Sequence, residues 1–280
     1  MYLRPRTLAE ATSALAGGPV LLIAGGTDLF PAHVGRPIEQ DVIDLSRVAE
    51  MLTITDTVDH HRLGGAVTWS RLIAEPLPSA FDALKQAARE VGSMQIQNRG
   101  TVAGNLCNAS PAADGIPPLL VLEAEVELAS PQGVRHLPLA GFLVGYRKTA
   151  RSGDEILAAI RIPKSAASGH SAFVKLGARR YLVISILMAA ARIVRAADGR
   201  IASAHVAVGS ASPTACRLTG LETDLIGLAA GERPSSVVAP RHLALLSPIS
   251  DGRATASYRR DAALHVVGAA LDRAFAAGMA

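Results

Sequence analysis

A stretch of small and polar residues at positions 97–118, the central stretch, carries the groups in this sequence best suited to ligand chemistry. It reads Gln-Asn-Arg-Gly-Thr-Val-Ala-Gly-Asn-Leu-Cys-Asn-Ala-Ser-Pro-Ala-Ala-Asp-Gly-Ile-Pro-Pro, too poor in large apolar residues for a core and too rich in Gly, Asn and Ser for a regular helix or strand. Gly100 and Gly104 let backbone N–H groups approach a ligand because no Cβ intervenes, and Asn105 and Ser110 favour tight turns. We predict an irregular loop that can hold an anion, typically a phosphate.

A second glycine segment, the N-terminal glycine turn at residues 24–29, follows an apolar run at positions 20–23 that is typical of a buried strand. Gly25 and Gly26 end the run abruptly, and Thr27 and Asp28 come next. Two such segments in one domain suggest two loops around one diphosphate. Neither matches the G-x-G-x-x-G pattern or the phosphate-binding loop that ends in Gly-Lys-Ser/Thr. The residues alone are therefore compatible with a diphosphate site and also with ordinary turns.

Three short motifs carry a sharper signal: Ala-Gly-Gly-Thr-Asp-Leu at positions 24–29, Thr-Val-Ala-Gly-Asn-Leu at 101–106 and Ala-Ser-Pro-Ala-Ala-Asp at 109–114. Together they resemble the FAD-binding medium subunit of the molybdenum hydroxylases, the family of xanthine dehydrogenase and carbon monoxide dehydrogenase. The resemblance continues in order through residues 145–149, 155–157 with 162–163, 172–175, 251–254 and 258–260. It covers essentially the whole chain.

The resemblance implies an α+β fold in two parts. The first is a two-lobed FAD-binding domain of the vanillyl-alcohol-oxidase-like (PCMH) type at residues 1–163, with lobes at about 1–55 and 56–163. The second is a smaller C-terminal domain of the carbon monoxide dehydrogenase flavoprotein type at residues 170–280, with a sheet and a small helical bundle. Residues 164–169 are mostly small and polar, so we expect a connector with few groups to pack that is cleaved first in limited proteolysis.

The resemblance also implies which residues contact FAD. Backbone N–H groups and threonine hydroxyls of the two glycine segments would hold the diphosphate. Asp114 would accept a hydrogen bond from a hydroxyl such as one of the ribityl chain, because a carboxylate repels phosphate. Lys175 would approach the flavin, where a cation favours the reduced, anionic ring. The expected cofactor-binding residues are Leu22, Ile23, Ala24, Gly25, Gly26, Thr27, Asp28, Leu29, Val91, Thr101, Val102, Ala103, Gly104, Asn105, Asp114, Leu157 and Lys175.

Several of these positions also fit a purely structural interpretation. Asp114 is consistent with a solvated turn, and Lys175 with a lysine on the polar face of an alternating strand. Val91 and Leu157 would be core residues on any interpretation, and the resemblance adds that each lines the flavin pocket. The family usually has a second glycine where Ala103 stands, so we expect its methyl group to narrow the room for the diphosphate slightly.

No catalytic residue is expected in this chain. Ser110 and Cys107 lack a recognisable base partner, and Cys107 is expected to be a small buried residue. The resemblance implies that non-covalently bound FAD takes electrons from a [2Fe–2S] partner subunit and passes them to an external acceptor. The resemblance further implies that the substrate is oxidised on a large subunit with the molybdenum cofactor, in a dimer of heterotrimers. Two alternatives stay open: a self-sufficient flavin-dependent oxidoreductase, and a non-redox nucleotide-binding module.

Composition limits other functions. The net charge of +4 is spread over 280 residues without a Lys/Arg block, so nucleic-acid binding is not expected. The two cysteines are too few for a disulfide framework or a four-thiolate cluster, and the eight histidines have no ligand spacing, so no metal site is expected. The N-terminus lacks a signal-peptide core, and no apolar run reaches the ~18 residues of a membrane span. We therefore expect a soluble, cytoplasmic protein.

Hydrophobic periodicity and capping residues predict the local elements. Strands are expected at 20–23 and 42–45 in a small parallel unit, at 52–57 with 61–65 and 126–129 with 134–137 as hairpins, and at 155–162 and 171–176. Residues 182–195 are rich in alanine like a helix, but the turn at 197–200 favours a hairpin with 201–209. Helices are expected at 7–16 before Gly17 and Gly18, from Trp69 with Thr68 as cap, and at 79–91 with Ser79 as cap, 117–124, 214–228, 240–246 and 257–277.

Overall fold

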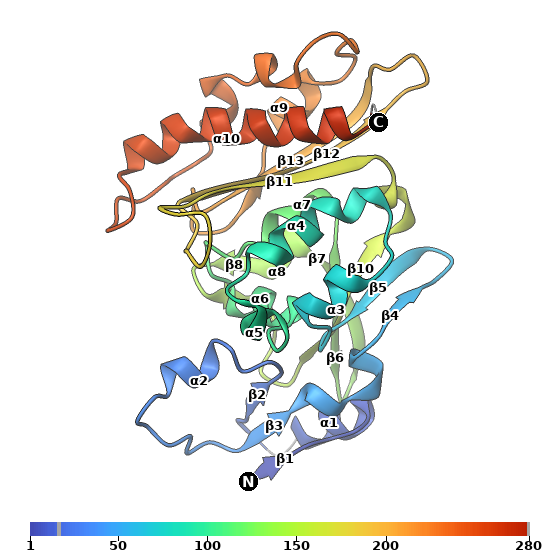
Figure 1. The fold of residues 1–280 in the computed structure, drawn as a ribbon. Helices are drawn as coiled ribbons and strands as arrows, with labels where there is room; N and C mark the ends of the chain where they lie inside the picture. Colours follow the sequence, from blue (N-terminus) through green and yellow to red (C-terminus); the bar gives the residue numbers. More distant parts are fainter. Residues whose placement is uncertain (16–17, 279–280) are drawn as a thin grey trace.

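The computed structural model of the chain describes residues 1–15 and 18–278. The N-terminus lies at one end of the molecule and the long C-terminal helix at the other (Figure 1). The first lobe is built on a parallel sheet with the strand order β1-β3-β2, which confirms the predicted parallel unit. Its elements are β1 (Tyr2–Leu3), α1 (Leu8–Leu15), β2 (Leu21–Ile23), α2 (Leu29–Ala32), β3 (Val42–Asp44), η1 (Leu45–Arg47) and η2 (Ala49–Met51).

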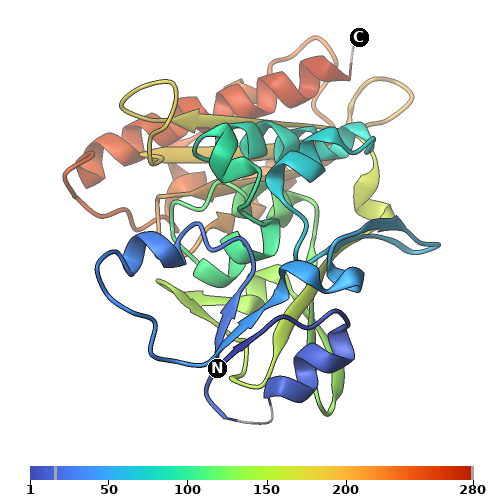
Figure 2. The same cartoon turned by 60° about the horizontal axis from the view of Figure 1, so that its bottom comes forward.

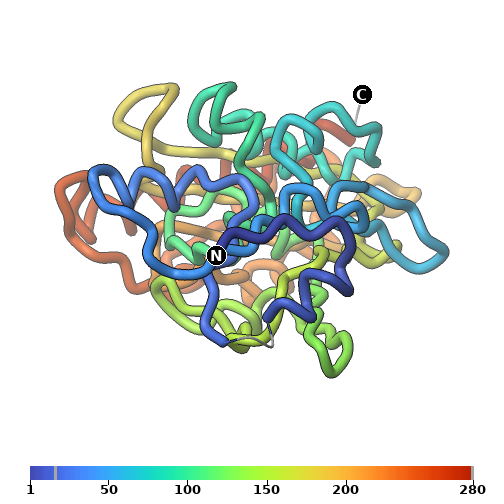
Figure 3. Tube along the Cα trace, turned by 90° about the horizontal axis from the view of Figure 1, so that it is seen from below, coloured from blue at the N-terminus to red at the C-terminus, as the bar shows by residue number. Residues whose placement is uncertain are grey.

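Helix α1 covers this small sheet because its apolar side falls on one face. Ala11 and Leu15 are buried against Ile43 and Val48 in a cluster of their own. The expected end of the helix at Ala16 and Gly17 lies outside the described residues. Seen from below, the first lobe lies in front of the rest of the chain, and its loop at residues 24–41 extends to one side (Figure 3).

The second lobe contains a five-stranded antiparallel sheet with the order β4-β5-β10-β6-β7. Both predicted hairpins are confirmed, as is the central strand, although β10 carries a bulge between Leu157 and Ala159. Alternation of buried and polar residues gives the sheet one core face, with Val126, Leu128 and Ile160 fully buried. The strands are β4 (Ile54–Asp56), β5 (His60–Gly64), β6 (Glu125–Ser130), β7 (Gly133–Pro138) and β10 (Ile156–Pro163), with β8 (Leu143–Gly145) and β9 (Lys148–Thr149) as a separate pair.

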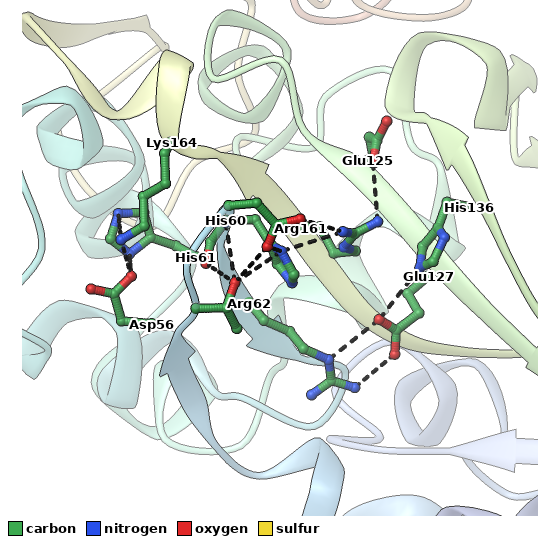
Figure 4. Close-up of polar contacts among 11 residues, drawn as sticks. Asp56, His60, His61, Arg62, Glu125, Glu127, His136, Arg161 and Lys164 are labelled. Carbon is green, nitrogen blue, oxygen red and sulfur yellow. Dashed lines mark hydrogen bonds and ion pairs between the residues drawn. The ribbon is translucent and has the colours of Figure 1, made fainter.

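The opposite side of this sheet is a charged face, formed by His60, Arg62, Glu125, Glu127, His136 and Arg161 (Figure 4). Arg62 donates to both carboxylate oxygens of Glu127, at 2.8 and 3.4 Å. Arg161 lies 3.5 Å from Glu125 and 3.3 Å from His60 Nδ1. Side chains of opposite charge on different strands therefore satisfy one another along this face.

The helices of the second lobe pack on the core face of the sheet. Thr68 caps α3 as predicted, through a hydrogen bond from the Arg71 amide. Ser79 does not cap a helix, because residues 79–81 form a 3-10 turn and the Ser79 hydroxyl donates to the Gly169 carbonyl instead. The elements are α3 (Trp69–Ala74), η3 (Ser79–Phe81), α4 (Asp82–Glu90), α5 (Met94–Gln97), α6 (Val102–Asn108), α7 (Ile116–Val121) and α8 (Leu139–Phe142).

The prediction of an irregular central stretch is wrong in part. Residues 102–108 form α6, whose first turn is capped by the Thr101 hydroxyl. Val102, Ala103 and Leu106 face the core from this short helix, so tertiary packing outweighs the low helix propensity of its Gly and Asn residues. Helix α7 then begins at Ile116, within the same stretch.

The C-terminal sheet lies between two helical layers, with α10 on one face and α4 and α7 of the second lobe on the other (Figure 1, Figure 2). Residues 187–193 of β12 are buried, which explains why this segment shows no alternation of apolar and polar residues: a strand covered on both faces by helices is buried on both sides. The expected hairpin is confirmed by the pairing of β12 with β13. The strands are β11 (His170–Leu176), β12 (Leu187–Arg195), β13 (Ile201–Gly209) and β14 (Cys216–Arg217).

Two predicted C-terminal helices and the connector differ from expectation. Within 214–228, Cys216 and Arg217 pair with β13, and only α9 (Thr219–Asp224) is α-helical. Within 240–246 the structure forms a 3-10 turn, η6 (Pro240–Leu243), after a similar turn η5 (Pro234–Val237), while α10 (Ala256–Ala277) is confirmed. The connector contains η4 (Lys164–Ala167), in which Ala166 is fully buried, whereas Ser165 and Ser168 are exposed.

Candidate functional site

The two glycine segments, far apart in sequence, lie directly against each other. A Cβ placed on Gly25 would stand 2.7 Å from the carbonyl carbon of Arg99 and 2.9 Å from Gly100 Cα. A Cβ placed on Gly100 would in turn stand 3.3 Å from Thr27 Oγ1. No side chain fits at Gly25, so the close approach of the two backbones requires glycine there.

Gly26 shapes the N-terminal glycine turn through its conformation. Its φ of +69° lies in the left-handed region that favours glycine, and a Cβ there would stand 2.7 Å from Phe30 Cδ2. Within the described chain, the amide N–H groups of Gly26, Thr27 and Asp28 have no hydrogen-bond acceptor. Asp28 is exposed, and its nearest partner is Arg147 Nη1 at 3.5 Å. The turn thus presents consecutive free donors, the arrangement that binds anions.

We call the region where the two glycine segments face each other the cradle. The central stretch contributes the start of α6 to it. Gly104 N–H donates to Thr101 Oγ1 at 2.9 Å, and a Cβ on Gly104 would stand 2.7 Å from the same oxygen. Gly104 is helical, so it uses no positive φ. Ala103 is 3% exposed and belongs to the core cluster of the second lobe.

Asn105 adds a buried polar atom without a partner. Among the described residues no donor reaches its Oδ1, which faces Gly115 closely enough that a Cβ there would stand 2.9 Å away. A buried amide oxygen left unpaired costs folding free energy. Such an atom can accept a hydrogen bond from a ligand. Together with the two glycine segments, where side chains are excluded, it makes these residues suitable for binding a dinucleotide.

Asp114 and Lys175, 61 residues apart, form one buried ion pair. Lys175 Nζ lies 2.7 Å from Asp114 Oδ2, and the two side chains are 7% and 8% exposed. Neither is the solvated residue that the sequence also allowed. Ser185 Oγ donates to Asp114 Oδ1 at 2.5 Å, and Lys175 also reaches the Glu90 carbonyl at 3.4 Å. Burial raises the pKa of Asp114, while the charge and hydrogen bond of Lys175 and the hydrogen bond of Ser185 act against that rise.

Most of the remaining expected site residues are apolar and buried or half-buried. Ile23, Val102 and Leu157 are buried, and Leu22, Leu29 and Val91 are half-buried. Val91 ends α4, next to the Glu90 carbonyl that Lys175 contacts. Ala24 forms the rim of the cradle, with about 520 Å³ of open cleft between the first lobe and Arg99.

A second cavity, of about 550 Å³, lies where the central stretch meets the C-terminal domain. Ser110, Tyr146, Ile184 and Ser185 form part of its wall, together with Ser210, Asp251 and Arg259. Ser210 Oγ and Arg259 Nε are buried without a hydrogen-bond partner in the described chain. The sequence did not mark Ser185, which lies in no motif, nor Arg99, although it lies in the central stretch, nor Arg147, although residues 145–149 carry the resemblance.

Comparison with known proteins defines the class of protein. Residues 1–165 match the family of the FAD binding domain in molybdopterin dehydrogenase, and residues 172–274 match the CO dehydrogenase flavoprotein C-terminal domain. This chain therefore belongs to the FAD-binding subunits of the molybdopterin dehydrogenases, an oxidoreductase family, as predicted.

Individual relatives match this chain over nearly its whole length and nearly all of their own. The xanthine dehydrogenase FAD-binding subunit of Escherichia coli O157:H7 is 32% identical over 95% of this chain and 91% of its own. The carbon monoxide dehydrogenase medium chain of Hydrogenophaga pseudoflava is 28% identical, over 98% and 96%. Quinoline 2-oxidoreductase from Pseudomonas putida 86 superposes with a TM-score of 0.89 at 26% identity, over 100% of this chain and 98% of that one.

Neither a metal-ligand group nor a helix that could cross a membrane is found among the described residues. In residues 1–15 and 18–278, no group of three His, Cys, Asp or Glu side chains is placed to hold a metal ion. Of the helices in that same part of the chain, none has the length and apolar character needed to cross a membrane. Cys107 is exposed rather than buried as expected, and neither it nor Cys216 is in a disulfide.

Proposed function

We propose that this chain is the electron-transfer subunit of a multi-subunit molybdenum hydroxylase, in which FAD takes electrons from a [2Fe–2S] partner subunit and passes them to an external acceptor. FAD supplies this chemistry because it is stable in both one- and two-electron forms. A [2Fe–2S] cluster takes four Cys, or two Cys with two His. The whole sequence holds two cysteines, in different predicted domains, so the relay before the flavin belongs on another subunit.

The single observation that carries the proposal is the apposition of two glycine segments with unpaired polar groups. The free N–H groups of Gly26, Thr27 and Asp28 suit the diphosphate oxygens. Asn105 Oδ1 is a buried acceptor that suits a hydroxyl of the nucleotide. Asp114 would accept a ribityl hydroxyl, and Lys175 would supply a positive charge beside the flavin.

The remaining elements of the proposal concern assembly. An FAD-binding domain at residues 1–163, with lobes at about 1–55 and 56–163, would be followed by a C-terminal domain at 170–280. The iron–sulfur small subunit and the molybdenum large subunit would join this chain in a dimer of heterotrimers. Unpaired Cys107 and Cys216 are consistent with a reducing compartment, and we propose a cytoplasmic location.

The decisive experiment uses the purified chain without partners. We expect a flavin spectrum, release of all the yellow colour by acid precipitation, and neither iron nor molybdenum by elemental analysis. Under anaerobic conditions, N-heterocycles and aldehydes should leave that spectrum unbleached. A colourless protein that does not take up added FAD would favour the non-redox nucleotide-binding alternative. Stoichiometric iron, or full bleaching by such a substrate without partners, would end the proposal.

A further inference from the structure

We propose that Ser185 is a positioning residue for Asp114, through which the C-terminal domain completes the FAD site. The inference rests on the proposed function, in which Asp114 binds a hydroxyl of FAD. Ser185 is 2% exposed, and its hydroxyl donates to Asp114 Oδ1 at 2.5 Å. It lies 71 residues from Asp114, beyond the last strand residue of β11 and just before β12.

The two C-terminal partners fix the carboxylate from opposite ends. Ser185 bonds Oδ1, and Lys175 bonds Oδ2 at 2.7 Å. An ionised carboxylate has about four acceptor positions, so these two bonds leave others for a ligand. The carboxyl plane is thus held in one orientation while it keeps the capacity to accept a hydroxyl hydrogen. Lys175 alone would hold the carboxylate at one oxygen only.

Ser185 is held in place by the residue that follows it. The Ile186 N–H donates to the Leu176 carbonyl at 2.8 Å, and the Ile186 carbonyl accepts a hydrogen bond from Arg259. Arg259 is 3% exposed and pairs with Asp251 at 2.8 Å. Ser185 is therefore anchored to α10 and β11, although the preceding residues 178–182 are exposed.

The electrostatic surroundings of Asp114 make the hydrogen bond from the Ser185 hydroxyl important for keeping Asp114 ionised. Asp114 is buried, which disfavours its charge, and the Glu90 carboxylate adds an unfavourable charge nearby. The favourable groups are Lys175, from β11, and the Ser185 hydroxyl. Removal of the hydroxyl should shift Asp114 toward its protonated form, which is a weaker acceptor for the hydroxyl of FAD.

The test compares Ser185→Ala, Ser185→Thr and Ser185→Cys in the full chain, with Ser203→Ala on β13 as the matched control. The FAD dissociation constant is measured from pH 5.5 to 8.5, alongside the thermal midpoint of the apoprotein. We expect Ser185→Ala to bind FAD about tenfold more weakly at neutral pH, with a loss that grows as the pH falls. Ser185→Thr should restore affinity, Ser185→Cys should be intermediate because a thiol is a weak donor, and Ser203→Ala should match the wild type.

The outcomes separate this inference from the proposed function. If the wild-type chain binds no FAD at any pH, the proposed function fails. If it binds FAD and Ser185→Ala has the same dissociation constant at every pH, only the positioning role is refuted. A loss in Ser185→Ala that does not change with pH and is matched by an equal loss of apoprotein stability would assign Ser185 a merely structural role and overturn the inference. Where Ser185→Ala fails to fold, the pH profiles of Ser185→Thr and Ser185→Cys decide.

Discussion

The cradle between the glycine segments and the charged face of the five-stranded sheet are both rich in polar groups, yet they differ in what those groups have left to bind. On the charged face, Arg62 and Glu127 satisfy each other through two hydrogen bonds. In the cradle, Asn105 Oδ1 and the N–H groups of Gly26 and Thr27 find no partner in the described chain. A buried polar atom without a partner, such as Asn105 Oδ1, is costly, and this cost distinguishes a site kept for a ligand from a surface that stabilises the fold.

Glycines of the chain likewise fall into two kinds, those with no room for a side chain and those with room. Gly25 is demanded by the neighbouring backbone of Arg99, whereas Gly153, in an exposed turn of the second lobe, has nothing within 4 Å of an added Cβ. Only the first kind should be sensitive to substitution. Three predictions test the contrast between cradle and charged face.

The largest effect is expected for Gly25→Val. Its side chain would overlap the Arg99 carbonyl and push the two glycine segments apart, an overpacking strain of up to about 3 kcal/mol. We expect FAD affinity to fall about a hundredfold or more, since each ~1.4 kcal/mol is tenfold in a binding constant. Equilibrium titration with FAD measures it. Gly153→Val is the control and should bind FAD like the wild type; near-normal binding by Gly25→Val would refute the placement of the diphosphate.

The sequence indicated the cradle but not its construction. The glycine motifs and the segments that follow them in order are local signals, and they were sufficient to predict the family and the α+β fold. Hydrophobic periodicity, also local, predicted most strands. The helical character of residues 102–108 was missed because core packing by Val102 and Leu106, a tertiary effect, decides it.

The burial of Lys175 was missed for a similar reason. Alternation along a strand places its side chain opposite the core of its own sheet, but the FAD-binding domain packs on that side and supplies Asp114. The role of Ser185 could not be predicted, because a single serine outside any motif gains meaning only from a contact 71 residues away.

Asn105→Leu should have a smaller effect: it should raise the stability of the apoprotein and lower its affinity for FAD. Replacement of the unpaired Oδ1 by an apolar group of similar size should stabilise the apoprotein by about 1 kcal/mol, because an unsatisfied buried acceptor is removed. The same change should weaken FAD binding about tenfold. Chemical denaturation of the apoprotein and FAD titration measure the two effects. Asn108→Leu, at the end of the same helix, should change neither; a destabilised Asn105→Leu apoprotein would mean that Oδ1 has a partner after all.

The smallest effect is expected on the charged face, for Glu127→Gln. Burial raises the pKa of Glu127 and the Arg62 guanidinium lowers it, with a net value below that of an ordinary glutamate. A lowered pKa means that the ion pair stabilises the fold above the unfolded-state value of about 4.3, and that this contribution is lost as the pH falls through the folded-state value. We expect Glu127→Gln to cost about 1 kcal/mol of unfolding free energy at pH 7, because the pair is only partly exposed and bidentate.

The difference between Glu127→Gln and the wild type should shrink progressively between about pH 5 and pH 3, measured by denaturant titration at each pH. Glu125→Gln is the matched control on the same face of β6: its side chain is 41% exposed and its contact with Arg161 is 3.5 Å long, so its effect should be close to zero. Both variants should keep wild-type FAD affinity, since neither group lies in the cradle. A Glu127→Gln variant with intact stability but weakened FAD binding would contradict the distinction between the two regions, because it would place a ligand-directed role on a face whose charges are already paired.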